Sequence, residues 1–142
     1  MTENEIRKAV DALLAAWTRH DFDGVLSLFS DDCVYEDLAL GLVFRGKDEL
    51  SGFIEHNFSS VPDFQCRLVK CFPGSNCATI ENELSGTPIS DPSGRSLPGT
   101  KSFRVRGVTI LEFENGLIRR NADYWDSASA MQQLGLTPAA EP

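Results

Sequence analysis

The sequence predicts an α+β fold in one domain, with helices first and antiparallel strands afterwards. Apolar residues recur at helical spacing over most of the first 58 residues. From Pro62 the pattern alternates instead, in four runs, and the short links PGSN and ENG each join two of them as in antiparallel hairpins. A chain of 142 residues favours a single core. Helices followed by a series of strands are typical of the α+β class.

The first half of the chain is expected to contain three helices and one short strand. An amphipathic helix is predicted over 3–19, with these apolar positions: Ile6, Ala9, Val10, Leu13, Leu14 and Trp17. Asp21 is a candidate cap for a second, short helix. The apolar face expected for that helix is Phe22, Val25, Leu26 and Phe29. The segment 31–38 is expected to be a turn and a short strand. After FRG, a third helix is predicted over 47–58.

The second half is expected to be mostly strands, at 63–72, 76–86, 101–113 and 116–125. The run that begins at Gly116 starts with strand alternation and ends, before Leu136, with helical spacing. We therefore place the domain at 1–136. The tail, 137–142, is expected to be flexible.

The connection at 85–100 does not resemble a tight hairpin. It contains three of the seven prolines and three glycines. Long ordered loops on small domains often cover a site. The sequence is equally compatible with a disordered hairpin tip, so both interpretations stay open.

Composition excludes several classes of function. The net charge is −8 and no basic run occurs, so we expect binding neither to nucleic acid nor to anionic membranes. No apolar run is long enough to span a membrane, and MTENEIRKAV lacks the apolar core of a signal peptide. We therefore expect a cytoplasmic protein.

The cysteines and histidines do not predict a metal site. Cys33, Cys66, Cys71 and Cys77 form no CxxC pair and match no common zinc spacing, so we expect reduced thiols packed in strands. His20 and His56 lie far apart in the sequence and are expected at the surface.

The last predicted strand carries polar residues beside a large aromatic one. With a period of two, Asn121 and Asp123 share a face with Trp125, which favours burial. A buried carboxylate costs several kcal/mol unless it is paired, hydrogen-bonded or neutralised. This pattern indicates either a polar cavity or a misleading alternation.

Two other strands show the same pattern. Tyr35 and Asp37 share a face of the first strand. Glu81 and Glu83 share a face of another, although Ile80 and Leu84 could instead mark the buried side and leave both glutamates in solvent. Carboxylates on three strands favour a common pocket if these faces converge. Arg104 and Arg106 are more simply explained by a solvated sheet edge or by salt bridges between subunits.

Three stretches resemble the SnoaL-like polyketide cyclases: DDCVYEDLALGLVFRGKDELSGFI, ELSGTPISDPSGRSLPGT and FRVRGVTILEFENGLIRRNADYWDSASAMQQLGL. These cyclases belong to the nuclear transport factor 2-like superfamily, together with ketosteroid isomerase and limonene-epoxide hydrolase. The resemblance covers nearly the whole chain and is sharpest at DYWD followed by QLG. It implies a cone-shaped curved antiparallel or mixed sheet closed by three helices, with an internal pocket. It also implies a homodimer.

The resemblance further implies roles for individual residues. In VYED, Asp37 takes the place of the general base of ketosteroid isomerase. The epoxide hydrolase's Arg-x-Asp falls on Glu81 and Glu83, and its later aspartate falls on Asp123. Because Glu81 replaces the arginine, epoxide hydrolysis is the less favoured chemistry. The first helix also offers Leu13, Leu14 and Trp17 where the isomerase has its oxyanion-hole tyrosine. SnoaL-like cyclases use a pocket aspartate without metal or cofactor.

We therefore expect cofactor-independent acid/base chemistry, an isomerisation or an intramolecular aldol cyclisation, on a hydrophobic carbonyl compound. A carboxylate that abstracts a proton next to a carbonyl needs a pKa raised toward neutrality, which a dry pocket and a second carboxylate both promote. The expected catalytic residues are Asp123 and, second, Asp37. The expected substrate-binding residues are Tyr35, Glu81, Glu83, Asn121 and Trp125. The alternative is a non-catalytic ligand-binding or assembly module of the same fold.

Overall fold

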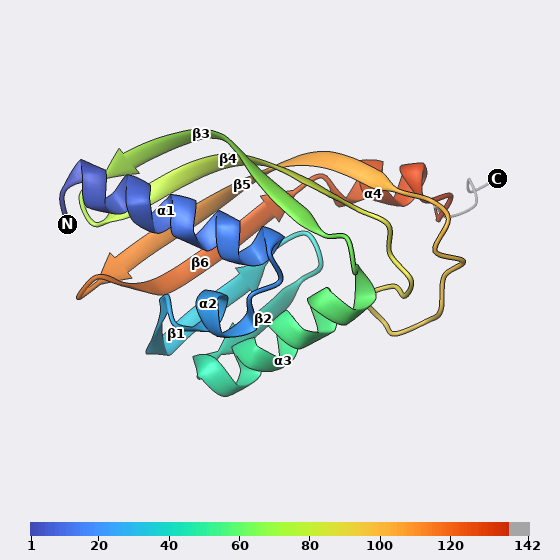
Figure 1. Ribbon diagram of the computed structural model, residues 1–142, viewed down its shortest axis with the longest axis horizontal. Coiled ribbons are helices and arrows are strands. Elements are labelled where there is room, and N and C mark those ends of the chain that lie inside the picture. The colour runs from blue at the N-terminus through green and yellow to red at the C-terminus, as the bar shows by residue number, and fades with distance from the viewer. Residues whose placement is uncertain (137–142) are drawn as a thin grey trace.

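Six strands form one curved mixed sheet in the computed structural model, which describes residues 1–136 (Figure 1). The order across the sheet is β2-β1-β6-β5-β4-β3; β1 and β6 are parallel and the other neighbours are antiparallel. The strands are β1 (Phe29–Asp37), β2 (Leu42–Arg45), β3 (Gln65–Gly74), β4 (Cys77–Gly86), β5 (Phe103–Glu114) and β6 (Leu117–Trp125). The predicted α+β fold is confirmed. The predicted flexible tail at 137–142 lies outside the described residues.

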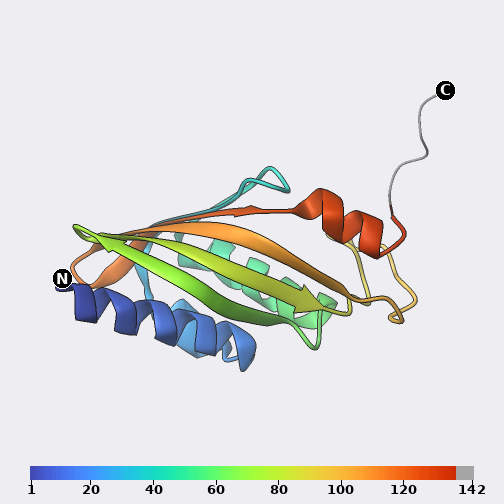
Figure 2. The same cartoon turned by 90° about the horizontal axis from the view of Figure 1, so that it is seen from above.

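Four helices accompany the sheet in this part of the chain: α1 (Glu3–Thr18), α2 (Phe22–Leu26), α3 (Gly46–Ser60) and α4 (Ser127–Gln133). α1 begins with a capping box, in which the side chains of Thr2 and Glu5 each accept a hydrogen bond from the other residue's backbone N–H. Asp21 caps α2 as predicted, accepting a hydrogen bond from Gly24 N at 2.9 Å. α1 packs against β3 and α3 against β1. Figure 2 shows the strands curving above α1.

One prediction about the first half was wrong, and one strand was missed. Phe29 does not belong to the short helix, which ends at Leu26; it begins β1, pairs with Ile118 and is fully buried. β2 was not predicted, because its four residues show no alternation of buried and exposed positions. β2 forms an antiparallel pair with the end of β1, and this pairing holds it in place.

The segment between β4 and β5 is attached to the end of α3. Ile89 N donates to Ser60 O at 2.8 Å, and the Ser90 hydroxyl donates to the Ser60 hydroxyl at 2.9 Å. Both Thr87 N and the Thr87 hydroxyl donate to the Asp63 carboxylate, at 2.6 and 2.8 Å. The loop therefore lies beside the C-terminal end of α3, as Figure 1 also shows.

No helix among residues 1–136 is long and apolar enough to cross a membrane. The four cysteines lie in strands as expected, and none is bonded to another.

Candidate active site

The parallel pairing of β1 with β6 brings the predicted polar residues together. Tyr35 lies beside Asn121, and Asp37 lies beside Asp123. On the other side of β6, the antiparallel partner of Asp123 is Thr109. Residues that face each other across neighbouring strands project to the same side of a sheet. The inner face of the sheet therefore carries two adjacent carboxyl groups with hydroxyl and amide groups around them.

Asp123 accepts hydrogen bonds from three side chains. Its Oδ2 accepts from the Tyr35 hydroxyl, and its Oδ1 accepts from the Thr109 hydroxyl at 2.7 Å and from Asn121 Nδ2 at 3.0 Å. The Thr109 hydroxyl accepts in turn from Asn82 Nδ2 at 3.0 Å. The three donors to Asp123 hold this carboxyl group in one position and favour its charged form.

Asp37 has fewer partners. Its Oδ1 accepts from Leu40 N and from Trp125 Nε1, both at 3.0 Å, while its Oδ2 receives only the same indole N–H, at 3.1 Å. Asp37 is only 4% exposed and is one of the residues that line the cavity. In Asp37 and in Asp123 alike, Oδ2 accepts one hydrogen bond and keeps a lone pair that can accept a proton.

Gly107 makes room for the side chains of Asn82 and Trp125, which lie close to the two aspartates. It lies between Trp125 on β6 and Asn82 on β4. A Cβ atom at position 107 would come within 2.9 Å of Asn82 Oδ1 and 3.0 Å of Trp125 Cβ. Since real Cβ atoms keep larger distances, a side chain here would displace Asn82 or Trp125. Glycine thus lets both approach the inner face.

Between the helices and the sheet lies a cavity of about 900 Å³. That volume is within the range of small-molecule sites. Its wall is mainly apolar and aromatic; Phe53, for example, stacks on Phe44 with ring centroids 4.6 Å apart and packs against Tyr35 at 5.1 Å. Five residues of the 85–100 loop line it: Pro88, Ser90, Asp91, Pro92 and Leu97. The loop therefore forms part of the cavity wall.

The cavity environment shifts the pKa values of its titratable groups. Burial raises the pKa of Asp123 above its ordinary value, against the three hydrogen bonds that lower it. Burial also raises the pKa of Asp37, and the charge of Asp123 raises it further, while the hydrogen bonds from Leu40 N and Trp125 act in the opposite direction. The pKa of Tyr35 lies well above its usual range, because the ring is buried next to the Asp123 carboxylate. Burial likewise raises the pKa of the Cys66 thiol to about 12.

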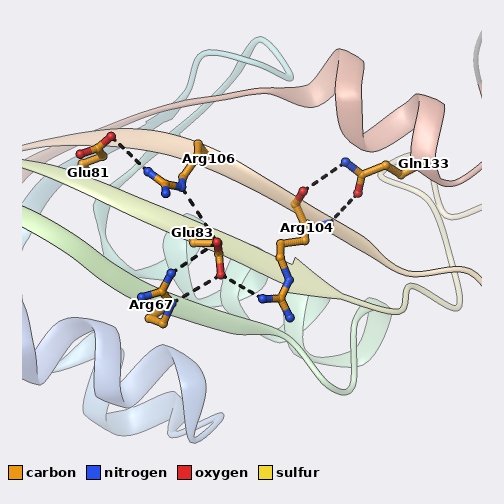
Figure 3. A network of polar contacts seen from close by, with 6 residues as sticks. All are labelled: Arg67, Glu81, Glu83, Arg104, Arg106 and Gln133. Carbon is orange, nitrogen blue, oxygen red and sulfur yellow. Dashed lines mark hydrogen bonds and ion pairs between the residues drawn. The ribbon is translucent and has the colours of Figure 1, made fainter.

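Glu81 and Glu83 do not line the cavity, so the prediction that they bind substrate there was wrong. Both lie on the outer face of β4, in ion pairs with arginines (Figure 3). Glu83 pairs with Arg67 and with Arg104, at 3.4 Å in both cases, and Glu81 pairs with Arg106 at 3.3 Å. The inner face of β4 carries Ala78, Ile80, Asn82 and Leu84, because apolar burial decided which side faces inward.

The structure adds Asn82 and Thr109 to the polar network. Asn82 is 3% exposed and Thr109 is 7% exposed. The signal in the sequence is weak, since each is one polar residue among apolar positions of a strand face. Asn82 shares its face with Ile80 and Leu84, and Thr109 shares its face with Val105 and Leu111. A polar residue in such a row is a candidate for a buried hydrogen bond.

A family of known protein domains matches most of this chain. The sequence profile of the SnoaL-like domain matches residues 10–121. No curated protein sequence matches the chain.

Solved structures share the fold over nearly the whole chain. A hypothetical protein of ketosteroid isomerase-like fold from Catenulispora acidiphila, in complex with trimethylamine, is 25% identical; the match covers 95% of this chain and 98% of that one, with a TM-score of 0.81. A protein from Shewanella denitrificans, assigned as a SnoaL-like polyketide cyclase, is 17% identical, with coverage of 96% and 100% and a TM-score of 0.81. An epoxide hydrolase similar to limonene-epoxide hydrolase, from Mycobacterium tuberculosis, is 21% identical, with coverage of 92% and 90% and a TM-score of 0.74.

Proposed function

This chain belongs to the SnoaL-like domain family, and we propose that it is an acid/base enzyme that isomerises or cyclises a hydrophobic carbonyl compound in its cavity. One observation carries the proposal: Asp37 and Asp123 lie side by side on β1 and β6, in a mainly apolar cavity, with unequal hydrogen bonding. Two neighbouring carboxyl groups in different environments are the arrangement that separates acid and base roles.

The hydrogen bonds support Asp37, rather than Asp123, as the residue that carries the proton. Three side-chain donors stabilise the Asp123 anion, whereas one side-chain donor, the Trp125 indole N–H, is shared by both oxygens of Asp37. The charge of Asp123 also raises the pKa of Asp37. In this proposal Asp37 is the general acid/base, and Asp123 is a positioning residue that holds Tyr35 and keeps the pKa of Asp37 raised.

The reaction begins when Asp37 Oδ2 takes a proton from the carbon next to the substrate's carbonyl group. The C–H electron pair moves into the carbon–carbon bond, and the carbonyl oxygen becomes an enolate. In an isomerisation, Asp37 returns the proton to another carbon. In a cyclisation, the enolate carbon forms a bond to a second carbonyl of the same molecule, and the new alkoxide takes the proton from Asp37. Positioned acid/base groups typically contribute about 10²- to 10⁴-fold to rate.

Epoxide hydrolysis by the route of the limonene enzyme is less well supported. The resemblance places the epoxide hydrolase's Arg-x-Asp at Glu81 and Glu83, and both lie on the outer face of β4. Within the described part of the chain, the residues that line the cavity include no arginine or lysine. The second candidate function is that of a ligand-binding module, in which the hydrogen bonds around Asp123 only stabilise the fold.

Hydrogen exchange in D₂O tests the proposal without knowledge of the natural substrate. Cyclic and aryl ketones are incubated with the protein, and the loss of the α-hydrogen signal is followed by ¹H NMR. We expect exchange above the buffer rate, reduced about 10²- to 10⁴-fold in Asp37→Asn. Glu83→Gln is the matched control, because its carboxylate lies in the outer ion-pair network. No exchange of any ketone by the unmodified protein would favour the binding module, and full exchange by Asp37→Asn would show that another group, such as Asp123, takes the proton.

The expected homodimer and cytoplasmic location stay predictions. Sedimentation equilibrium at micromolar concentration tests the first, and a single species with the mass of one chain, 15.6 kDa, would contradict it.

A further inference from the structure

A glycine in the middle of α3 lies in the wall of the cavity. Gly52 belongs to the helix interior, six residues after the first residue of α3, and it is one of the residues that line the cavity. Its neighbours along the helix surface, Glu49 at i−3 and His56 at i+4, line the cavity as well. The missing side chain of Gly52 therefore leaves a gap in the wall between Glu49 and His56.

The packing of the protein does not require a glycine at position 52. Among residues 1–136, no atom would lie within 4 Å of a Cβ atom built there, whereas a Cβ atom at Gly107 would meet Asn82. The φ angle of Gly52 is not positive, so its backbone suits any residue. Glycine in a helix interior is less stable than alanine, because it loses more conformational freedom on folding. Gly52 thus lowers stability without relieving a clash within the described chain.

The gap lies at the open side of the cavity. Gly52 is itself exposed to solvent, as are its neighbours Glu49 and His56. β2 packs beside α3, and two apolar residues of β2, Leu42 and Val43, also line the cavity while being 38% and 48% exposed. Large apolar side chains at the edge of a cavity mark a surface on which a ligand can bury apolar area.

An aromatic contact holds these two parts of the cavity mouth together. Phe53 follows Gly52 in α3, and Phe44 follows Val43 in β2. The two rings stack with centroids 4.6 Å apart. The open space at Gly52 and the apolar surface of β2 therefore belong to one mouth.

We propose that Gly52 is a specificity-determining residue, which lets a ligand in the cavity extend an alkyl chain through the mouth, across Gly52 and against Leu42 and Val43. An alkyl chain suits this path because it is narrow and because it removes the two apolar side chains from water. The inference rests on the proposed function only in placing the ligand in this cavity. It does not depend on which group transfers a proton.

The test compares two ketones that share the 6-acyl-2-dimethylaminonaphthalene group and differ in the acyl chain, which is propionyl in one and dodecanoyl in the other. The fluorescence of this group changes when it leaves water, so titration gives a Kd for each ketone. The dodecanoyl ketone is kept below the concentration at which it aggregates in buffer. Gly52→Leu fills the gap. Ser59→Leu is the matched control, because Ser59 is exposed on the same helix and, within residues 1–136, is not among the lining residues.

Gly52→Leu should weaken binding of the dodecanoyl ketone and leave binding of the propionyl ketone within about 2-fold. Each methylene group removed from water contributes about 4-fold to affinity, so a leucine that displaces two of them costs about 10- to 20-fold. Gly52→Ala should raise the melting temperature by about 1 to 4 °C, because alanine favours the helix and meets no atom of the described chain.

Four results would overturn the inference: no binding of the dodecanoyl ketone, equal losses of affinity for the two ketones in Gly52→Leu, equal effects of leucine at positions 52 and 59, or a lower melting temperature of Gly52→Ala. If Gly52→Leu does not fold, Gly52→Ala must weaken binding of the dodecanoyl ketone alone.

The outcome is separable from that of the proposed reaction. Binding that depends on chain length and on Gly52, without α-hydrogen exchange of any ketone, keeps the role of Gly52 and removes the enzymatic one. Exchange that depends on Asp37, with ketone binding unchanged in Gly52→Leu, does the reverse.

Discussion

The change Tyr35→Phe tests whether Asp123 is a buried anion held by its hydrogen bonds. Tyr35 is 4% exposed, and its hydroxyl donates to Asp123 Oδ2. Phenylalanine keeps the ring, which packs against Phe29 and Phe53 with centroids 6.0 and 5.1 Å apart. The substitution therefore removes one of the three donors to Asp123 and leaves the aromatic packing in place.

The size of the effect follows from the charge of Asp123. A hydrogen bond to a charged group contributes about 1.5 to 3 kcal/mol, and a neutral one contributes about 0.5 to 1.5 kcal/mol. At neutral pH, Tyr35→Phe should lower the free energy of unfolding by the larger amount. When Asp123 is protonated at acidic pH, the loss should shrink to the smaller amount.

The sign of the pH dependence is set by the raised pKa of Asp123. Burial makes the folded protein hold this proton more tightly than the unfolded chain does. The resulting stability is fully present below the pKa of this carboxyl group in the unfolded chain, ordinarily 3.8, and is lost as pH rises through the folded pKa. Without the Tyr35 hydroxyl this pKa rises further, so the loss on raising the pH becomes larger.

Urea denaturation from about pH 4 to about pH 8 measures this difference. Tyr124→Phe is the control, since Tyr124 is the other tyrosine and is 45% exposed. A destabilisation of Tyr35→Phe that does not change with pH would show that Asp123 does not titrate in this range and would refute the reasoning. Equal stability of Tyr35→Phe and the unmodified protein would refute the hydrogen bond itself.

Three further predictions concern the same cavity. Asp123→Asn removes the charge that raises the pKa of Asp37. The pH at which the α-hydrogen exchange rate falls on acidification, or the pKa of Asp37 measured by NMR, should therefore be lower in this variant. An unchanged value would contradict the positioning role of Asp123. Gly107→Ala should lower the free energy of unfolding by about 1 to 3 kcal/mol, because the new Cβ atom meets Asn82 and Trp125. Thermal or urea denaturation measures this loss. Unchanged stability would mean that both side chains can shift to make room. The loop at 85–100 should exchange its amide hydrogens more slowly when a ketone occupies the cavity than when the cavity is empty. Identical rates would contradict the expectation that this loop covers the site.

The local pattern of the sequence determined most of the helices and strands. Apolar spacing and the Asp21 cap located the first two helices, because a helix must bury one continuous stripe and satisfy its first N–H groups. The alternation around Trp125 also placed Asn121 and Asp123 on one face of β6, the face that lines the cavity. These features depend on residues a few positions apart, so one sequence is enough to find them.

Tertiary structure alone decided which face of each strand is inner. Alternation in β4 defines two faces, one with Glu81 and Glu83 and one with Ile80 and Asn82, but it does not say which one packs on the helices. Burial of Ile80 turned the glutamates toward Arg67, Arg104 and Arg106, which are distant in sequence.

The partners of Asp123 were likewise fixed by strand pairing. Tyr35 lies 88 positions away and Thr109 lies 14 positions away, and they reach the same carboxylate because β1 and β5 both pair with β6. Contacts of this kind depend on which elements become neighbours, and the spacing of residues along the chain does not encode that directly.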